Sequence, residues 1–147
     1  MEVQEKERLD RMRGTVALKI YRNGVLEEED KGHNLIVTAG RSKLAKLLGG
    51  GYAGAINRIG VGTGSTPAAD GDKGLTNAVY IPVSSVEYGD AKVRFNFVIG
   101  SSDANGMSIR ELGLFFADGT IFSRRVRKSV IGKEDDLQIT GYWEIYL

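Results

Sequence analysis

Three two-residue turns, each set between runs of alternating residues, constrain the fold of this chain more than any other feature. They are Asn23-Gly24, Gly89-Asp90 and Asp118-Gly119. Asn-Gly is typical of a type I′ turn, because both central residues of that turn need a positive φ. The flanking runs alternate with a period of two, as strands with one buried face do. The turns therefore predict three β-hairpins.

The strands expected around these turns cover most of the chain. They are predicted over residues 14–22 and 25–31, Val79–Tyr88 and Ala91–Ile99, Met107–Phe116 and Thr120–Lys128, with a last strand over Leu137–Leu147. Pro82 indicates an edge strand or a bulge, because proline cannot donate to the ladder. On the last strand Trp143 shares a face with Ile139 and is expected in the core. Tyr142 and Tyr146 then lie on the opposite face.

A single short helix is expected near residues 39–48, where three leucines recur at i, i+3 and i+4. Thr38 is its predicted N-cap and Gly49 follows its last turn. One helix and three hairpins predict an α+β fold, mainly antiparallel β, with sandwich-like sheets of hairpins. We expect a flexible N-terminal arm over residues 1–13 and a single β-rich domain over 14–147.

Composition excludes several classes of function. The 147 residues suit one domain, and 20 Lys and Arg stand against 19 Asp and Glu, so no overall charge draws the chain to nucleic acid. Cysteine is absent and His33 is the only histidine, which excludes thiolate and multi-histidine metal sites. The N-terminal segment has no apolar run of the signal-peptide kind, and no stretch approaches 18 apolar residues, so no membrane partner is expected.

Two loops have compositions that suggest a phosphate-binding or calcium-binding site, but their residue spacing opposes both interpretations. The glycine-rich run Gly60–Ser65 is followed by Thr66-Pro67 instead of a helix, which disfavours a phosphate-binding loop. Asp70–Gly74 lacks the third ligand, the central glycine and the glutamate of an EF-hand. No pair of carboxylates is spaced for acid–base catalysis. We therefore predict no catalytic, cofactor-binding or metal-binding residue, and the chain is not expected to be an enzyme.

The densest basic cluster is Arg124–Lys128. On a strand, Arg125 and Arg127 would face one side and Arg124 the other. The neutral total charge and the lack of a companion basic helix oppose nucleic-acid binding. A charged edge strand or a salt-bridged subunit contact is the preferred interpretation.

Four segments, in the same order and together covering about residues 32–147, resemble bacteriophage tail-fibre and baseplate-associated proteins. They are HNLIVTAGRSKLAKLLGGG, INRIGVGTGSTPAADGDKGLTN, IRELGLFFADGTIFSRRV and ITGYWEIYL. The second resembles the glycine-threonine turn of that family, the third its Glu-Leu-Gly-Leu-Phe … Asp-Gly hairpin, and the fourth its terminal tryptophan strand.

The resemblance implies a virion structural protein of the tail, assembled in the host cytoplasm. Its partners would be itself, as a trimer or hexamer, and other phage tail proteins, as a fibre-root, baseplate or tail adaptor component. In tail fibres such a domain usually precedes a much longer chain, and this sequence ends at Leu147, which favours an adaptor or short tail component. The alternative is a small carbohydrate- or cell-surface-binding module, which predicts an exposed aromatic platform beside Asn and Asp side chains.

Apolar, aromatic and basic side chains outside the expected core are the candidates for subunit contacts. The predicted interface residues are Leu9, Met12, Phe115, Arg125, Arg127, Tyr142 and Tyr146.

Overall fold

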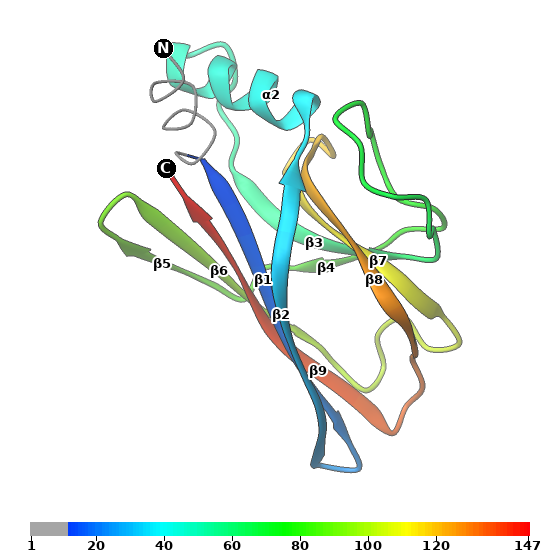
Figure 1. Cartoon of the computed structure of the whole chain (residues 1–147). Coiled ribbons are helices and arrows are strands. Elements are labelled where there is room, and N and C mark those ends of the chain that lie inside the picture. The colour runs from blue at the N-terminus through cyan, green and yellow to red at the C-terminus, as the bar shows by residue number, and fades with distance from the viewer. Residues whose placement is uncertain (1–11) are drawn as a thin grey trace, which may run out of the picture.

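The computed structural model describes residues 12–147, which form nine strands and one helix (Figure 1). The elements are β1 (Arg13–Arg22), β2 (Val25–Ile36), α2 (Thr38–Gly49), β3 (Ile56–Gly62), β4 (Val79–Pro82), β5 (Ser85–Gly89), β6 (Lys92–Ile99), β7 (Ser108–Phe116), β8 (Ile121–Gly132) and β9 (Leu137–Tyr146). The prediction of a mainly antiparallel β fold with one short helix is confirmed.

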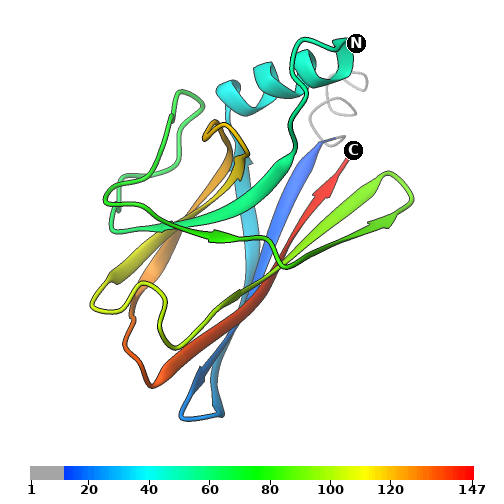
Figure 2. The same cartoon turned by 180° about the vertical axis from the view of Figure 1, so that it is seen from behind.

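All the strands belong to one curled antiparallel sheet in the order β4-β3-β7-β8-β2-β1-β9-β6-β5. Strand β2 joins its two halves, because it pairs with β1 along most of its length and with β8 only at Leu35 and Ile36. Figure 2 shows β3 and β4 passing in front of β2. The expected sandwich-like sheets are not confirmed, since the curl makes a half-barrel from a single sheet.

The strand predicted through Pro82 is divided in two. Strand β4 pairs with β3 and β5 pairs with β6, so the two pieces lie at opposite ends of the sheet. Between them, the N–H of Val83 donates to Asn57 O at 2.9 Å and the N–H of Ser84 donates to Asn96 O at 2.8 Å. Two residues thus connect the sheet's two edges. The prediction that Pro82 lies on an edge strand is confirmed.

The predicted turns are present, one of them shifted by a residue. Asn23 and Gly24 both have positive φ, at 51° and 78°, as a type I′ turn requires. Gly119, with φ 93°, closes the β7–β8 turn. The second turn consists of Asp90 and Ala91, with Ala91 at φ 52°, so the preceding glycine ends β5 instead of entering the turn.

The core lies inside the curl. Its largest buried side chains include Trp143 and Phe97, which are at most 1% exposed. Strand β9 alternates as predicted, with Ile139 and Trp143 buried and Tyr142 half-buried. Gly141 also faces inward, where the ring of Phe97 lies over it. Large apolar side chains from both halves of the sheet therefore fill the space that the curl encloses.

Helix α2 lies across one end of the sheet, the end where β1 begins and β9 ends (Figure 1). Its N-cap is Val37, without a side-chain cap, and the N–H of Thr38 donates to Asp70 O at 2.9 Å. Its C-cap is Gly50, in the left-handed region at φ 82°. The predicted N-cap, Thr38, is therefore one residue late, and the predicted C-terminal glycine, Gly49, is one residue early. Gly40 is the buried residue of the helix and packs against the backbone of Phe122 in β8.

An ion pair joins helix α2 to the β7–β8 turn, and it is expected to shift the titration of the Asp118 carboxyl group. Lys43 Nζ lies 2.6 Å from Asp118 Oδ2, and the N–H of Thr120 donates to Asp118 Oδ1 at 3.0 Å. The hydrogen bond from Lys43, followed by that from Thr120, lowers the pKa of Asp118 from 3.8 to about 2. Because the folded state favours the charged carboxylate, this stabilisation is present above pH 3.8 and is lost as the pH falls toward 2.

An NMR titration of the Asp118 carboxyl carbon should therefore give a midpoint near 2, and Lys43→Met should move it back toward 3.8. Lys46→Met is the matched control, because Lys46 lies in the same helix and forms no ion pair with Asp118. A midpoint near 3.8 in the unaltered protein would show that the ion pair does not form in solution.

Candidate interaction site

The structure separates the predicted interface residues into buried and surface groups. Leu9 lies outside the described residues. Met12 is half-buried and packs against the core. Phe115 is buried, whereas Tyr142 and Tyr146 are half-buried on the outer face of β9. The two arginines, Arg125 and Arg127, come from β8 and are considered separately below.

The prediction that Phe115 offers apolar surface to a neighbouring subunit is wrong. Its side chain is 1% exposed, although it points away from the main core. The segment between β3 and β4 folds over this side of the sheet, and Leu75 packs against the cluster that contains Phe115. The ring of Tyr80 adds an edge contact at 5.0 Å between ring centroids. From Glu111 to Phe116, β7 is therefore covered on both faces by its own chain.

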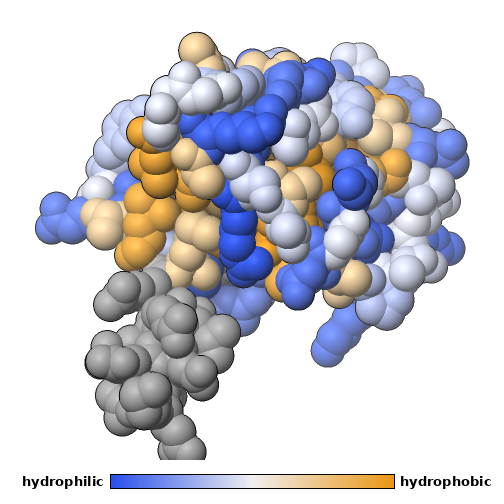
Figure 3. Space-filling view, turned by 90° about the horizontal axis from the view of Figure 1, so that it is seen from above, coloured by the Kyte–Doolittle hydropathy of each residue, from blue (hydrophilic) through white to orange (hydrophobic). Residues whose placement is uncertain are grey.

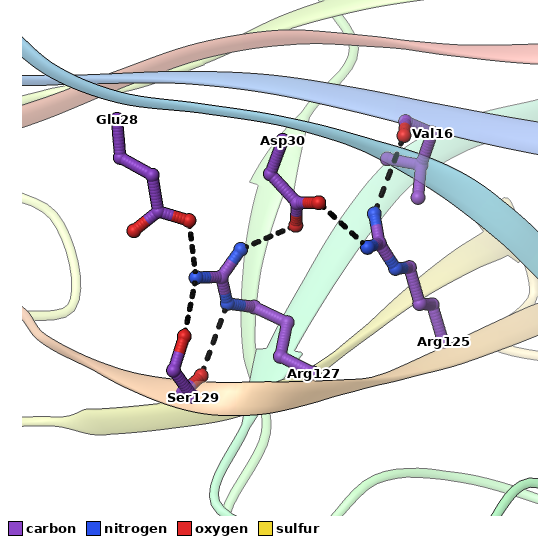
Figure 4. Close-up of polar contacts among 6 residues, drawn as sticks. All are labelled: Val16, Glu28, Asp30, Arg125, Arg127 and Ser129. Carbon is purple, nitrogen blue, oxygen red and sulfur yellow. Dashed lines mark hydrogen bonds and ion pairs between the residues drawn. The ribbon is translucent and has the colours of Figure 1, made fainter.

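Arg125 and Arg127 form ion pairs within the chain (Figure 4). Arg127 Nη1 lies 2.6 Å from Asp30 Oδ2 and its Nη2 lies 2.9 Å from Glu28 Oε2. Arg125 Nη2 lies 2.8 Å from Asp30 Oδ1 and its Nη1 donates to Val16 O at 3.3 Å. We call Glu28, Asp30, Arg125 and Arg127 the seam cluster.

The seam cluster closes the sheet where its backbone pairing stops. Strands β2 and β8 pair at Leu35 and Ile36 and then diverge, and the seam cluster spans the opening. The side chain of Arg127 is only 2% exposed. The predictions of an edge strand and of a subunit contact are both corrected, because β8 is interior to the sheet and its arginines bind carboxylates of β2.

A second buried network holds the long β3–β4 segment in place. Glu111 Oε2 accepts hydrogen bonds from the N–H groups of Gly64 and Thr76, at 2.6 and 2.9 Å. Glu111 Oε1 accepts one from Arg124 Nε at 2.9 Å, and Arg124 Nη1 lies 2.9 Å from Asp72 Oδ2. Both Glu111 and Arg124 are buried. The carboxylate of Glu111 thus holds the glycine-rich run at Gly64 and the end of the segment at Thr76.

The outer face of β9 carries a third polar cluster around Glu144. Burial raises the pKa of Glu144, but hydrogen bonds from Tyr146 and Arg94, together with the positive charge of Arg94, outweigh that effect and lower it. Arg94 also stacks over the ring of Tyr142, with its guanidinium carbon 3.9 Å from the ring centroid. A groove of about 510 Å³ lies beside Tyr142, with Ala17 among its lining residues. Tyr142 therefore remains at the surface, ordered by a cation–π contact.

The most exposed aromatic side chain of the described residues is Tyr88, at 83%. It lies on β5, whose five residues are all exposed and which ends the sheet. The exposed large apolar residues are Val25, Leu26, Leu48, Tyr80, Val86, Tyr88, Val98, Val130 and Leu147. Figure 3 shows apolar surface at the α2 end of the molecule. The sequence prediction did not include β5 as a candidate site, because it joined β4 and β5 into one strand through Pro82.

Within residues 12–147, no group of three or more His, Cys, Asp or Glu side chains is placed to hold a metal ion. No helix in the described part of the chain has the length and apolarity needed to cross a membrane. Comparisons of the chain with protein-family models, with curated proteins and with solved structures each give no match.

Proposed function

We propose that this chain is a structural subunit of a bacteriophage tail, a fibre-root, baseplate or adaptor component that acts through homo-oligomerisation and contacts with other tail proteins. The observation that carries the proposal is the exposed strand β5. Its side chains Val86 and Tyr88 are 39% and 83% exposed on a strand with no neighbour on one side in the described structure. Exposed strand edges and surface aromatic residues favour protein–protein contact.

The packing of the segments that resemble tail proteins supports the same proposal. The glycine-threonine turn and the Glu-Leu-Gly hairpin lie far apart in sequence, yet Glu111 of the hairpin binds the backbone N–H of Gly64 in the turn. The terminal tryptophan strand supplies Trp143 to the core. These segments thus form one packed unit, as expected if the resemblance reflects a common fold.

The native mass in solution tests this proposal. We expect light scattering on a sizing column to give three or six times 16.0 kDa, because a tail axis favours closed cyclic assemblies. The mass should persist at high salt if apolar contacts dominate the interface. A monomer at every concentration would contradict self-assembly. A monomer that also binds glycans saturably would favour the carbohydrate-binding alternative.

A further inference from the structure

We propose that β5 of one copy pairs with β5 of a second copy, antiparallel and about a two-fold axis at Glu87. This inference rests on the proposed self-association and names the surface that carries it. The occupant of the edge is therefore the same strand of an identical chain. The reasons are the direction of the free backbone groups, the side chains that the pairing brings together, and the charges beside them.

The register of the sheet fixes which backbone groups of β5 face outward. The N–H of Leu147 donates to Ala91 O at 2.8 Å, so Ala91 points toward β9. Hydrogen-bonding direction alternates along a strand, so Lys92 and Arg94 point toward β5, where they pair with Gly89 and Glu87. The N–H and C=O groups of the intervening residues, positions 86 and 88, therefore face the free edge.

Those two residues select the register of a symmetric pair. When Val86 of one copy lies opposite Tyr88 of the second, both positions exchange two backbone hydrogen bonds, giving four in all. The same register places an aromatic ring against a β-branched side chain twice, which is a favourable cross-strand combination. A register centred on Val86 would instead place the two Val86 residues opposite each other and leave Tyr88 near the end of the paired segment. A register centred on Tyr88 would do the same with the two residues exchanged. The edge is complementary to itself.

Charge modulates this contact without preventing it. The two Glu87 side chains would face each other across the axis, which is unfavourable alone. Each carboxylate, however, accepts a hydrogen bond from Asn96 of its own chain at 3.0 Å and lies opposite Arg94 in the register. A central row of four charges then forms in the order Arg94, Glu87, Glu87 and Arg94, so each Glu87 has an arginine of its own chain on its other side. Added salt, which screens the repulsion at the axis, should not dissolve the pair.

The opposite edge of the sheet, strand β4, is less suited to pairing with a second copy than β5 is. Strand β4 has four residues and contains Pro82, which lacks an N–H to donate. Strand β5 contains neither proline nor lysine, and a single glutamate is its only charge. Proline, lysine and short length are the features that keep edge strands from pairing. Within residues 12–147, Pro82 protects one edge of the sheet, and no strand covers the other.

A contact of this kind joins copies two by two. By itself it gives a dimer, and together with a separate three-fold contact it gives a hexamer of D3 symmetry. The hexameric mass expected above and the β5 contact are therefore compatible, but neither requires the other.

The test uses the absence of cysteine from the chain. Glu87→Cys introduces a single thiol, and in the proposed register the two Cα atoms lie about 4.5 Å apart, within the range for a disulfide. Under mild oxidation at micromolar concentration we expect a disulfide-linked dimer. Ser85→Cys is the matched control, because it is exposed on the same face and its two copies would lie about 14 Å apart. Equal cross-linking of both variants, or none by Glu87→Cys, would overturn the proposal.

Two further substitutions test whether β5, and not another surface, carries the self-assembly. Tyr88→Glu should weaken dimerisation at least about tenfold in sedimentation equilibrium, whereas Glu87→Gln should strengthen it by removing the repulsion at the axis. If the chain assembles but neither substitution changes its mass, another surface carries the assembly and the β5 inference fails. If Glu87→Cys cross-links but no trimer or hexamer forms, the β5 contact holds and the ring fails.

Discussion

Replacing Glu111 by alanine should lower the free energy of unfolding by about 3 kcal/mol, since it breaks a buried ion pair. The carboxylate is 1% exposed and receives two backbone N–H groups as well as the guanidinium of Arg124. Removing it leaves three donors in the interior with one acceptor fewer each, and leaves Arg124 with Asp72 as its remaining ion-pair partner.

Urea unfolding monitored by Trp143 fluorescence measures this loss. Glu29→Ala is the matched control, because Glu29 forms an exposed ion pair with Lys19 at 3.7 Å and should change stability by less than about 0.5 kcal/mol. Hydrogen exchange should also become faster at Gly64 and Thr76, whose N–H groups lose their acceptor. Equal stabilities for the two variants would show that Glu111 does not hold the β3–β4 segment.

A double-mutant cycle separates the pair from its surroundings. Arg124→Ala alone leaves the buried carboxylate of Glu111 without its cation, and Glu111→Ala alone leaves the buried guanidinium with Asp72 as its one remaining carboxylate, so each single change removes part of the compensation of a buried charge. The double variant contains neither the carboxylate of Glu111 nor the guanidinium of Arg124. Its destabilisation should therefore be smaller than the sum of the two single effects by at least about 1 kcal/mol.

The strands and turns were predictable from sequence because they depend on neighbouring residues. Period-two alternation along β6 and β9 places Phe97 and Trp143 inside the sheet, and the structure agrees. The Asn23-Gly24 turn also follows from local conformational preference, since both residues adopt positive φ. Local patterns give the direction of each side chain but do not specify which strands become neighbours.

The curl of the sheet was not predictable, because it depends on contacts between distant segments. Nothing around Pro82 reveals that the chain leaves one edge of the sheet and enters the other within two residues. From the sequence, the basic run of β8 is interpreted as surface charge, since its partners, Glu28 and Asp30, lie about a hundred positions earlier. The sequence predicts an accessible Phe115 for the same reason, because the covering residue Leu75 comes from a loop without regular structure.

The second large effect on stability is expected where helix α2 packs on the sheet. A Cβ added to Gly40 would lie 2.7 Å from Phe122 Cα, 2.9 Å from its carbonyl carbon and closer still to its carbonyl oxygen. All three are backbone atoms of β8, so they cannot move aside as the end of a side chain can. Gly40→Ala should therefore push the helix away from the sheet and destabilise the fold by about 2 kcal/mol, although alanine is the better helix former.

Gly49 provides the control within the same helix, because a Cβ added there meets nothing within 4 Å. Gly49→Ala should stabilise the protein by about 0.5 kcal/mol, since the only effects are helix propensity and a smaller entropy of the unfolded chain. Opposite signs for the two substitutions, measured by thermal unfolding, follow from close packing at one glycine and open space at the other. Stabilisation by both would mean that α2 does not rest on Phe122, and the end of the half-barrel would then be open.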